Sequence, residues 1–393
     1  MQRRQLLQAA ALPATCFGRV WAAPAQDARF LMVFLRGGYD AMSLLVPSSS
    51  SFYRETRPNI AISLAANGKP GATPLDANWA LHPALEASVL PLLRQGQASL
   101  VPFAGIDDLS RSHFETQDSI ELGQPLGGRR DYQSGFLNRL AAQLQSKGAM
   151  AFTDQLPIVM RGNFETANIS LRDTGRGNLS PALRAGVTEM YRDTPLQPKV
   201  TEAFALRDEV AREMSNEMNA ASRNAISARG FEQEARRMAR MMRERHRLGF
   251  VDVGGWDTHV NQGSNSGYLA SRLEELGRGL AAYADELGPA AWRQTVVVVM
   301  SEFGRTAREN GNRGTDHGHG SVYWVLGGAL TGGPVVGEQQ AIEAKTLFQN
   351  RDLPVLNDYR ALLGGLLARQ FGLSPTALDK VFPGAAPRDW GLL

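Results

Sequence analysis

The chain has 393 residues, 43% of them hydrophobic, with 40 glycines and one cysteine. This apolar content is ample for a sizeable core, and the glycines indicate many tight strand-to-helix turns, as in a soluble α/β protein. The formal net charge of +3 gives no indication of a nucleic-acid-binding surface, and a single cysteine excludes an internal disulfide.

The first 25 residues have the pattern of a twin-arginine export signal. Arg3 and Arg4 form a paired-arginine start, a short and weakly apolar stretch follows, and small residues end the segment near Ala25. Because the segment also holds Arg19 and no acidic residue, cleavage brings the formal net charge to zero. We expect one mature domain, residues 26–393, in the periplasm or outside the cell. The alternative is an uncleaved N-terminal helix.

The only cysteine, Cys16, lies inside this signal. Lipidation of Cys16 is the weaker alternative, because proline and threonine stand where a lipoprotein cleavage box favours small or aliphatic side chains. The mature chain then has no thiol, which excludes cysteine catalysis and thiolate metal ligands. No later stretch has the roughly 20 apolar residues of a membrane span, so we expect no transmembrane segment.

Four apolar runs are predicted as buried strands, and each is followed by a polar cluster. The runs span residues 30–35, 98–104, 248–253 and 295–300. Segments with helical spacing lie between them, at 84–93, 135–145 and 268–287. This alternation predicts a three-layer α/β sandwich with a mostly parallel sheet covered on both faces. In such sheets ligands bind beyond the carboxyl ends of the strands, so we expect the polar clusters to meet there.

Residues 201–247 are rich in Ala, Glu, Arg and Met and contain almost no strand-forming residues. This composition predicts a helical insertion of one or two long amphipathic helices, with a charged solvent face and methionines toward the core. A binding role for the segment is the weaker alternative.

Two short motifs offer metal ligands. Asp257 and His259 follow the third strand, and in an extended stretch residues i and i+2 face the same way, so both can reach one Zn²⁺ or Mn²⁺ ion. Asp316, His317 and His319 lie in a glycine-rich loop whose backbone freedom allows side chains to close around an ion. A capped turn or an ordinary polar loop would also produce these motifs.

Two acids at other strand ends are further candidates. Asp40 follows a Gly-Gly pair after the first strand, and Glu302 ends the fourth. Both could bind a metal, or they could be ordinary turn acids, with Glu302 paired to Arg305. The histidines favour a site, because four of the six lie at strand ends that this topology brings together: His113, His259, His317 and His319.

The ordered motifs FLRGGYDA, SRSHF, GGWDTH, SEFGR and GTDHG, behind a twin-arginine leader, resemble the exported bacterial family called domain of unknown function 1501. The resemblance covers about residues 29–390. That family is usually grouped with the alkaline phosphatase and sulfatase superfamily. The resemblance therefore implies an alkaline phosphatase-like fold and a metal-dependent hydrolase, with no established substrate.

On this resemblance, Asp40 matches the superfamily's first-strand metal aspartate, and Asp257 with His259 matches its second ligand group. Glu302 matches the acid at the fourth strand end, and His317 the late histidine ligand.

The chain departs from the superfamily at Phe303, where a histidine is usual. One of the two usual metal sites has therefore lost a ligand, or it uses Asp316 or His319 instead. We expect a divalent metal, zinc or else manganese or calcium, as one or two ions.

The superfamily places its nucleophile at the start of the helix after the second cluster. Ser112 is the preferred candidate and Ser110 the second, because a helix is predicted from Phe114 and its N-terminus favours an alkoxide. Alternatively, Ser112 is a helix N-cap and Glu115 completes a capping box. His113 is then a ligand or an acid.

Arg36, Arg111 and Arg305 stand beside the clusters and could hold an anionic ester bidentately, or they could form salt bridges with nearby acids. The resulting hypothesis is an exported metal-dependent hydrolase of a phosphate or sulfate ester. The alternative is a non-catalytic exported binding or assembly protein with a structural metal and an exported protein partner. Nucleotide binding is disfavoured because the full dinucleotide glycine pattern is absent.

Overall fold

The computed structural model describes residues 27–66, 68, 70–145, 148–169, 186, 189–198, 226–227 and 230–393. The predicted export signal, with Cys16, lies outside these residues, and so does most of the predicted helical insertion at 201–247. Within the described part of the chain, no helix is long and apolar enough to cross a membrane.

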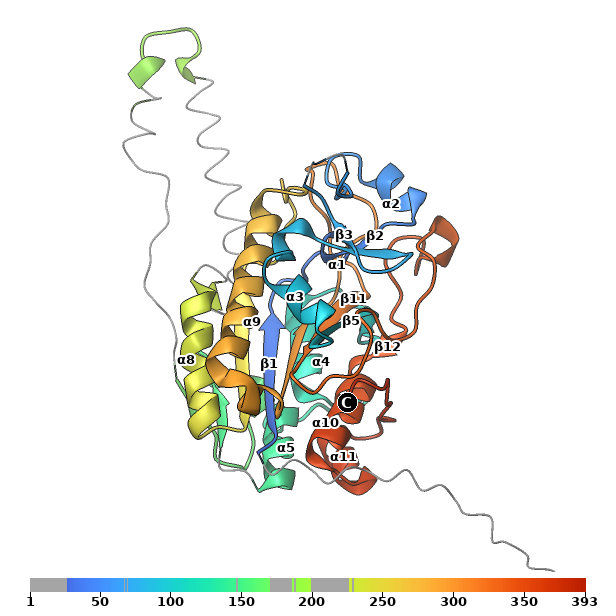
Figure 1. Ribbon diagram of the computed structural model, residues 1–393. Helices are drawn as coiled ribbons and strands as arrows, with labels where there is room; N and C mark the ends of the chain where they lie inside the picture. Colours follow the sequence, from blue (N-terminus) through green and yellow to red (C-terminus); the bar gives the residue numbers. More distant parts are fainter. Residues whose placement is uncertain are drawn as a thin grey trace, which may run out of the picture.

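A nine-stranded sheet forms the centre of the described structure (Figure 1). Its order is β12-β5-β11-β10-β1-β9-β6-β7, and β8 also pairs with β9. The bounds in that order are Asn357–Asp358, Ala98–Gly105, Ser321–Leu326, Thr295–Ser301, Arg29–Leu35, Leu248–Gly254, Ala149–Ala151 and Ala167–Asn168, with β8 at Ile226–Ser227. All pairings are parallel except those of β11 with β10 and β5. The four predicted strands are β1, β5, β9 and β10, and the mostly parallel sheet is confirmed.

Helices cover both faces of this sheet, so the three-layer α/β prediction is confirmed. One face carries α3 (Val89–Arg94), α8 (Phe231–Glu244) and α9 (Tyr268–Trp292). The other face carries α4 (His113–Leu122), α5 (Phe136–Leu144), α10 (Tyr359–Phe371) and α11 (Pro375–Val381). Helix α8 falls inside the segment predicted as a helical insertion.

The alternation of side chains along β1 divides the core into two clusters. Leu31, Val33 and Leu35 face the first set of helices, and Phe30, Met32 and Phe34 face the second. Because both faces are covered, the strand appears in the sequence as an unbroken apolar run.

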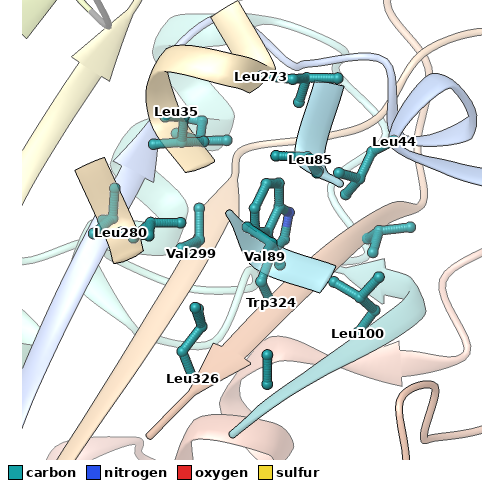
Figure 2. Packing of buried hydrophobic residues seen from close by; sticks show 14 of the residues in the cluster. Leu35, Leu44, Leu85, Val89, Leu100, Leu273, Leu280, Val299, Trp324 and Leu326 are labelled. Carbon is teal, nitrogen blue, oxygen red and sulfur yellow. The ribbon is translucent and has the colours of Figure 1, made fainter. Parts of the chain in front are cut away.

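Figure 2 shows the first of these clusters, where the sheet meets α3 and α9. Val299 of β10 and Trp324 of β11 pack against Val89 and Leu280 from the helices. The indole Nε1 of Trp324 donates to the hydroxyl of Tyr39 at 3.1 Å, so its polar atom is satisfied although the ring is buried.

The predicted helix over 84–93 is divided in two. A 3-10 turn, η1 (Pro83–Leu85), precedes α3, which begins only at Val89. Pro91 explains the late start, because proline lacks a backbone N–H and is tolerated only in the first helical turn. The other two predicted helices correspond to α5 and α9.

The smaller elements lie mainly toward the end of the sheet to which β1 points (Figure 1). A three-stranded sheet is formed by β2 (Leu45–Pro47), β4 (Trp79–Leu81) and β3 (Thr73–Pro74). The short helices are α1 (Ala41–Leu44), α2 (Ser51–Thr56), η2 (Ile158–Met160) and η3 (Ala344–Thr346). The polar clusters that follow β1, β5, β9 and β10 share this rim, because those strands run parallel.

Candidate metal centre

Four side chains of metal-ligand type meet at this rim, and we call His113, Asp257, His259 and His317 the metal cluster. His113, Asp257 and His317 each offer a ligand atom within 4.8 Å of the other two, and His259 lies beside Asp257 and His317. His317 Nε2 lies 2.9 Å from His113 Nε2 and 3.1 Å from His259 Nε2. Asp257 Oδ1 lies 2.9 Å from His259 Nε2 and 3.4 Å from His317 Nε2, and its Oδ2 lies 3.5 Å from His113 Nε2. The cluster thus brings together His113, the first residue of α4, the loop that follows β9 and the loop that precedes β11.

Each imidazole of the cluster is held at its other nitrogen, Nδ1, by an acceptor. The pairs are His113 with Glu302 Oε1 at 2.7 Å, His317 with the Arg111 carbonyl at 3.0 Å, and His259 with Asp316 Oδ1 at 3.3 Å. An Nδ1 that faces an acceptor carries the proton, so the Nε2 lone pairs of His113 and His259 both face His317 Nε2, and His259 Nε2 also lies 3.4 Å from Arg305 Nη1. Lone pairs this close repel unless a cation or a proton lies between them.

The spacing of these atoms fits a divalent metal. Zinc–nitrogen distances of about 2.0–2.1 Å in a tetrahedral site place neighbouring ligand atoms roughly 3.3 Å apart. The contacts described above run from 2.9 to 3.5 Å. Imidazole nitrogens with one carboxylate suit Zn²⁺ and Mn²⁺, whereas Ca²⁺ takes oxygen ligands. The cluster could therefore hold zinc or manganese.

Burial and hydrogen bonds shift the pKa values of the cluster residues and of Glu302. Burial alone would lower the pKa of His113, but hydrogen bonds to Asp257 and Glu302 raise it to about 9. Burial opposes ionisation of Glu302, yet the hydrogen bond to His113 lowers its pKa to about 2. Asp257 is also buried, and hydrogen bonds to the three histidines together with the Arg305 charge hold its pKa far below the usual range. A proton on His113 and a metal ion compete for the same lone pair.

Arg305 belongs to the scaffold beneath the cluster. Its side chain is 0% exposed and forms a salt bridge with Asp257 Oδ1. It also donates to the carbonyls of Gly37 and Thr315. Gly37 has a φ of +124°, and a Cβ there would lie 2.7 Å from the backbone nitrogen of Asp257. Only glycine allows β1 and the Asp257 loop to approach this closely.

Asp40, a predicted ligand, lies outside the cluster. Its carboxylate accepts two hydrogen bonds from Arg57, at 2.6 and 3.0 Å. The Ser43 hydroxyl and the Gln262 amide each donate to it at 2.7 Å. These four donors occupy the oxygens that a metal would need.

The remaining predicted ligands divide into two groups. Glu302 and Asp316 lie behind His113 and His259, where they orient the imidazoles instead of facing the cluster centre. His319 lies apart: its Nε2 is 3.6 Å from Asp107, and its ring stacks on Phe348 at 5.0 Å between centroids.

Phe303 lies beside the cluster, and one possible ligand group is found among the described residues. Its ring centroid lies 4.9 Å from that of His113 and 5.1 Å from that of His317. The side chain is buried, so an apolar ring fills the space beside the cluster. Asp316 and His319 contribute no second group there.

Both sequence neighbours of Ser112 contact or belong to the cluster. The carbonyl of Arg111 faces His317, and His113 follows directly as a cluster residue. Ser112 is the N-cap of α4, but its side chain makes no capping hydrogen bond, so the predicted capping box with Glu115 does not form. Arg111 has a φ of +52°, a left-handed conformation that costs energy for a non-glycine residue. Ser110 is exposed, and its hydroxyl lies 3.4 Å from that of Thr116.

The guanidinium groups of the other two predicted arginines are paired with acids. Arg36 is buried between Glu121 at 2.8 Å and Asp252 at 2.6 Å. Arg111 binds Asp352 at 2.7 Å and is 23% exposed. All three arginines, including Arg305, therefore form salt bridges with acids, which was the alternative to binding an anionic ester.

Sequence reasoning missed the residues that support the cluster. Gln117 donates to Glu302 at 2.8 Å and accepts from Arg36 at 2.8 Å, and Arg57 and Gln262 hold Asp40. One available signal was the position of Gln117, one helical turn after His113 on the same face of α4. Arg57 and Gln262 belong to no motif.

A family described as "Protein of unknown function (DUF1501)" matches residues 27–382. No curated protein matches the chain. Among solved structures, a protein of the alkaline phosphatase superfamily from Vibrio parahaemolyticus is similar at 10% identity and a TM-score of 0.35, over 78% of this chain and 62% of that chain. The chain thus spans less than two thirds of that protein.

A second solved structure, Ps i-CgsB in complex with k-i-k-neocarrahexaose, is similar at 10% identity and a TM-score of 0.43, over 93% of this chain and 76% of that chain. Ps i-CgsB in a separate structure gives 10% identity and a TM-score of 0.38, over 90% of this chain and 74% of that chain.

Proposed function

The chain belongs to the DUF1501 family, and from this premise we propose that it is an exported hydrolase that binds one divalent metal and cleaves a phosphate or sulfate ester. One observation carries the proposal. The Nε2 atoms of His113 and His317 converge with the Asp257 carboxylate, His259 Nε2 lies beside Asp257 and His317, and each Nδ1 faces an acceptor. Export is inferred from the twin-arginine pattern of the first 25 residues.

Solvent access supports a catalytic use of the cluster. The side chains of His259 and His317 are 26% and 19% exposed, whereas those of His113 and Asp257 are 5% and 3% exposed. The cluster therefore has a buried side and a side open to water. If His113, Asp257 and His317 hold the ion, the fourth position is left for water, as in catalytic zinc sites, whereas four protein ligands close a structural site.

The residues of the chain take distinct parts in this proposal. Ser112 is the nucleophile, because its hydroxyl makes no capping bond and the N-terminus of α4 favours negative charge there. Glu302 fixes the orientation and tautomer of His113, and Asp316 does the same for His259. When bound, a divalent metal supplies positive charge that stabilises an ionised oxygen nucleophile and the negative charge of the ester. The imidazole nitrogens favour zinc, and the Asp257 carboxylate leaves manganese as the alternative.

A second candidate function is a non-catalytic exported binding protein with a structural metal. The observation that favours it is the pairing of Arg36, Arg111 and Arg305 with Glu121, Asp352 and Asp257. No guanidinium among these three is left to hold an anionic ester. In that case the partner is another exported protein.

The test is metal content followed by turnover. Folded protein recovered from gel filtration is analysed for bound elements and then assayed with p-nitrophenyl phosphate and p-nitrophenyl sulfate, with and without chelator. We expect one equivalent of zinc or manganese and hydrolysis that the chelator abolishes. Bound metal without hydrolysis of either ester would favour the second candidate, and no uptake of metal on titration would overturn both.

The nucleophile is tested by two matched serine variants. We expect Ser112→Ala to lower turnover by about 100-fold or more, since an attacking group is removed, and to leave metal content unchanged. Ser51→Ala makes the same change on an exposed serine that begins α2 and should keep parental turnover. If Ser112→Ala also keeps parental turnover, Ser112 is only the residue that begins the helix and is not the nucleophile.

A further inference from the structure

The side-chain amide of Gln262 connects the two loops that carry the metal cluster. Its Oε1 accepts from the hydroxyl of Thr258 at 3.2 Å and from that of Thr315 at 3.1 Å. Thr258 stands between Asp257 and His259, and Thr315 stands two residues before His317. All three residues of this Thr258–Gln262–Thr315 clamp are buried.

The other end of the amide is anchored to the Asp40–Arg57 ion pair. Gln262 Nε2 donates to Asp40 Oδ2 at 2.7 Å and lies 3.3 Å from the Ser43 hydroxyl. Asp40 is itself fixed by the two hydrogen bonds from Arg57. The amide oxygen is therefore held on a rigid, charge-paired support directly after β1.

Backbone hydrogen bonds also join the two loops, and the clamp adds side-chain hydrogen bonds at the same residues. The Thr315 N–H donates to the Thr258 carbonyl at 3.1 Å, and the Gln262 N–H donates to the Arg313 carbonyl at 3.0 Å. A shift of either threonine would move the neighbouring cluster residues. Metal affinity is sensitive to such shifts, since removal of a group that orients the ligands typically costs about 10–100-fold.

We propose that Gln262 is a positioning residue which, through the hydroxyls of Thr258 and Thr315, sets the distance of Asp257 and His259 from His317 and thereby the metal affinity. This inference rests on the proposed function only in that the cluster binds a divalent metal. It gives Asp40 a role as the anchor of the clamp, in place of metal ligation.

The test removes one hydroxyl at a time and keeps the shape of the side chain. Replacement of Gln262 would remove a hydrogen bond from four buried partners and could destabilise the fold. The variants are therefore Thr258→Val and Thr315→Val, and each is compared with the serine variant at the same position. Dissociation constants for Co²⁺ and the visible absorption spectrum of the Co²⁺ complex are measured on the folded protein. The spectrum reports ligand geometry, which a loss of stability alone would not change.

We expect each valine variant to bind Co²⁺ about 10–100-fold more weakly with an altered spectrum, and each serine variant to return close to the parent. Thr295→Val is the matched control, because Thr295 is also buried but bonds the Ala291 carbonyl at the opposite end of β10. Parental affinity and spectrum in both valine variants would overturn the inference alone. Serine variants as weak as the valine ones would also overturn it, since packing would then be the cause. A parent that binds no Co²⁺ would overturn the proposed function with it.

Discussion

The His317→Ala variant is expected to bind divalent metal more than about 100-fold more weakly than the parent, since loss of a ligand costs more than loss of an orienting group. His317 Nε2 is the atom that lies nearest to both other imidazoles of the cluster. Its side chain is 19% exposed on a loop, so the fold should survive the change. Elemental analysis after gel filtration measures the loss, and circular dichroism checks the fold.

The matched control for this variant is His319→Ala. His319 lies two residues further along the same loop and was also a predicted ligand, but its ring stacks on Phe348 outside the cluster. We expect it to retain parental metal content. Loss of metal in His319→Ala with retention in His317→Ala would contradict the cluster as described.

The Asp257→Ala variant should also lose metal, and it should in addition leave the buried Arg305 without its acid. Asp257 is the carboxylate that neutralises Arg305, whose side chain is 0% exposed. Without Asp257 the buried guanidinium is uncompensated, which repels a cation and destabilises the fold. Its metal loss is therefore interpretable only beside that of His317→Ala, in which no buried charge is stranded.

The Asp40→Asn variant is expected to lower the free energy of unfolding by about 3–5 kcal/mol, because breaking a buried ion pair leaves the other charge unpaired. The side chains of Arg57 and Asp40 are 0% and 1% exposed and lie 2.6 Å apart. Urea denaturation measures the change. Glu338→Gln is the control: it removes the acid of an ion pair with Arg388 that is about half exposed, and such pairs are worth roughly 0–1 kcal/mol.

The same ion pair gives the parent a pH dependence with a definite sign. Burial would raise the pKa of Asp40, but the charge and hydrogen bonds of Arg57 lower it below its ordinary value. A carboxylate with a lowered folded-state pKa contributes stability that is present above its unfolded pKa of about 3.9 and is lost as pH falls through the folded value. Parental stability should therefore fall in acid below about pH 4, and the Asn variant should lack this component.

Metal content separates the two interpretations of Asp40. As the anchor of Gln262, Asp40 does not touch the ion, so Asp40→Asn should still take up one equivalent at saturating metal. As a ligand, which the family resemblance implied, its loss would abolish uptake. If Asp40→Asn has parental stability and binds no metal, Asp40 is a ligand and not the anchor of Gln262.

The sequence alone predicts four strands of the sheet and the edge at which the candidate site lies. Runs such as Thr295 to Met300 are apolar because parallel strands are buried on both faces, and that pattern is local. The polar residues that follow these runs predict the rim, because the carboxyl ends of parallel strands meet at one edge of the sheet. The sequence therefore predicts that His113, His259 and His317 lie at one site.

Only the tertiary structure decided which acids face the imidazoles and which support them. Asp40 is taken by Arg57 and by Gln262, which lies 222 residues away, and Glu302 turns to the far nitrogen of His113, 189 residues away. A carboxylate in a turn has the same local sequence pattern whether it meets a metal, an arginine or an imidazole. Its partner is chosen by long-range packing, because a buried charge must be paired by whichever group the fold brings within hydrogen-bond distance.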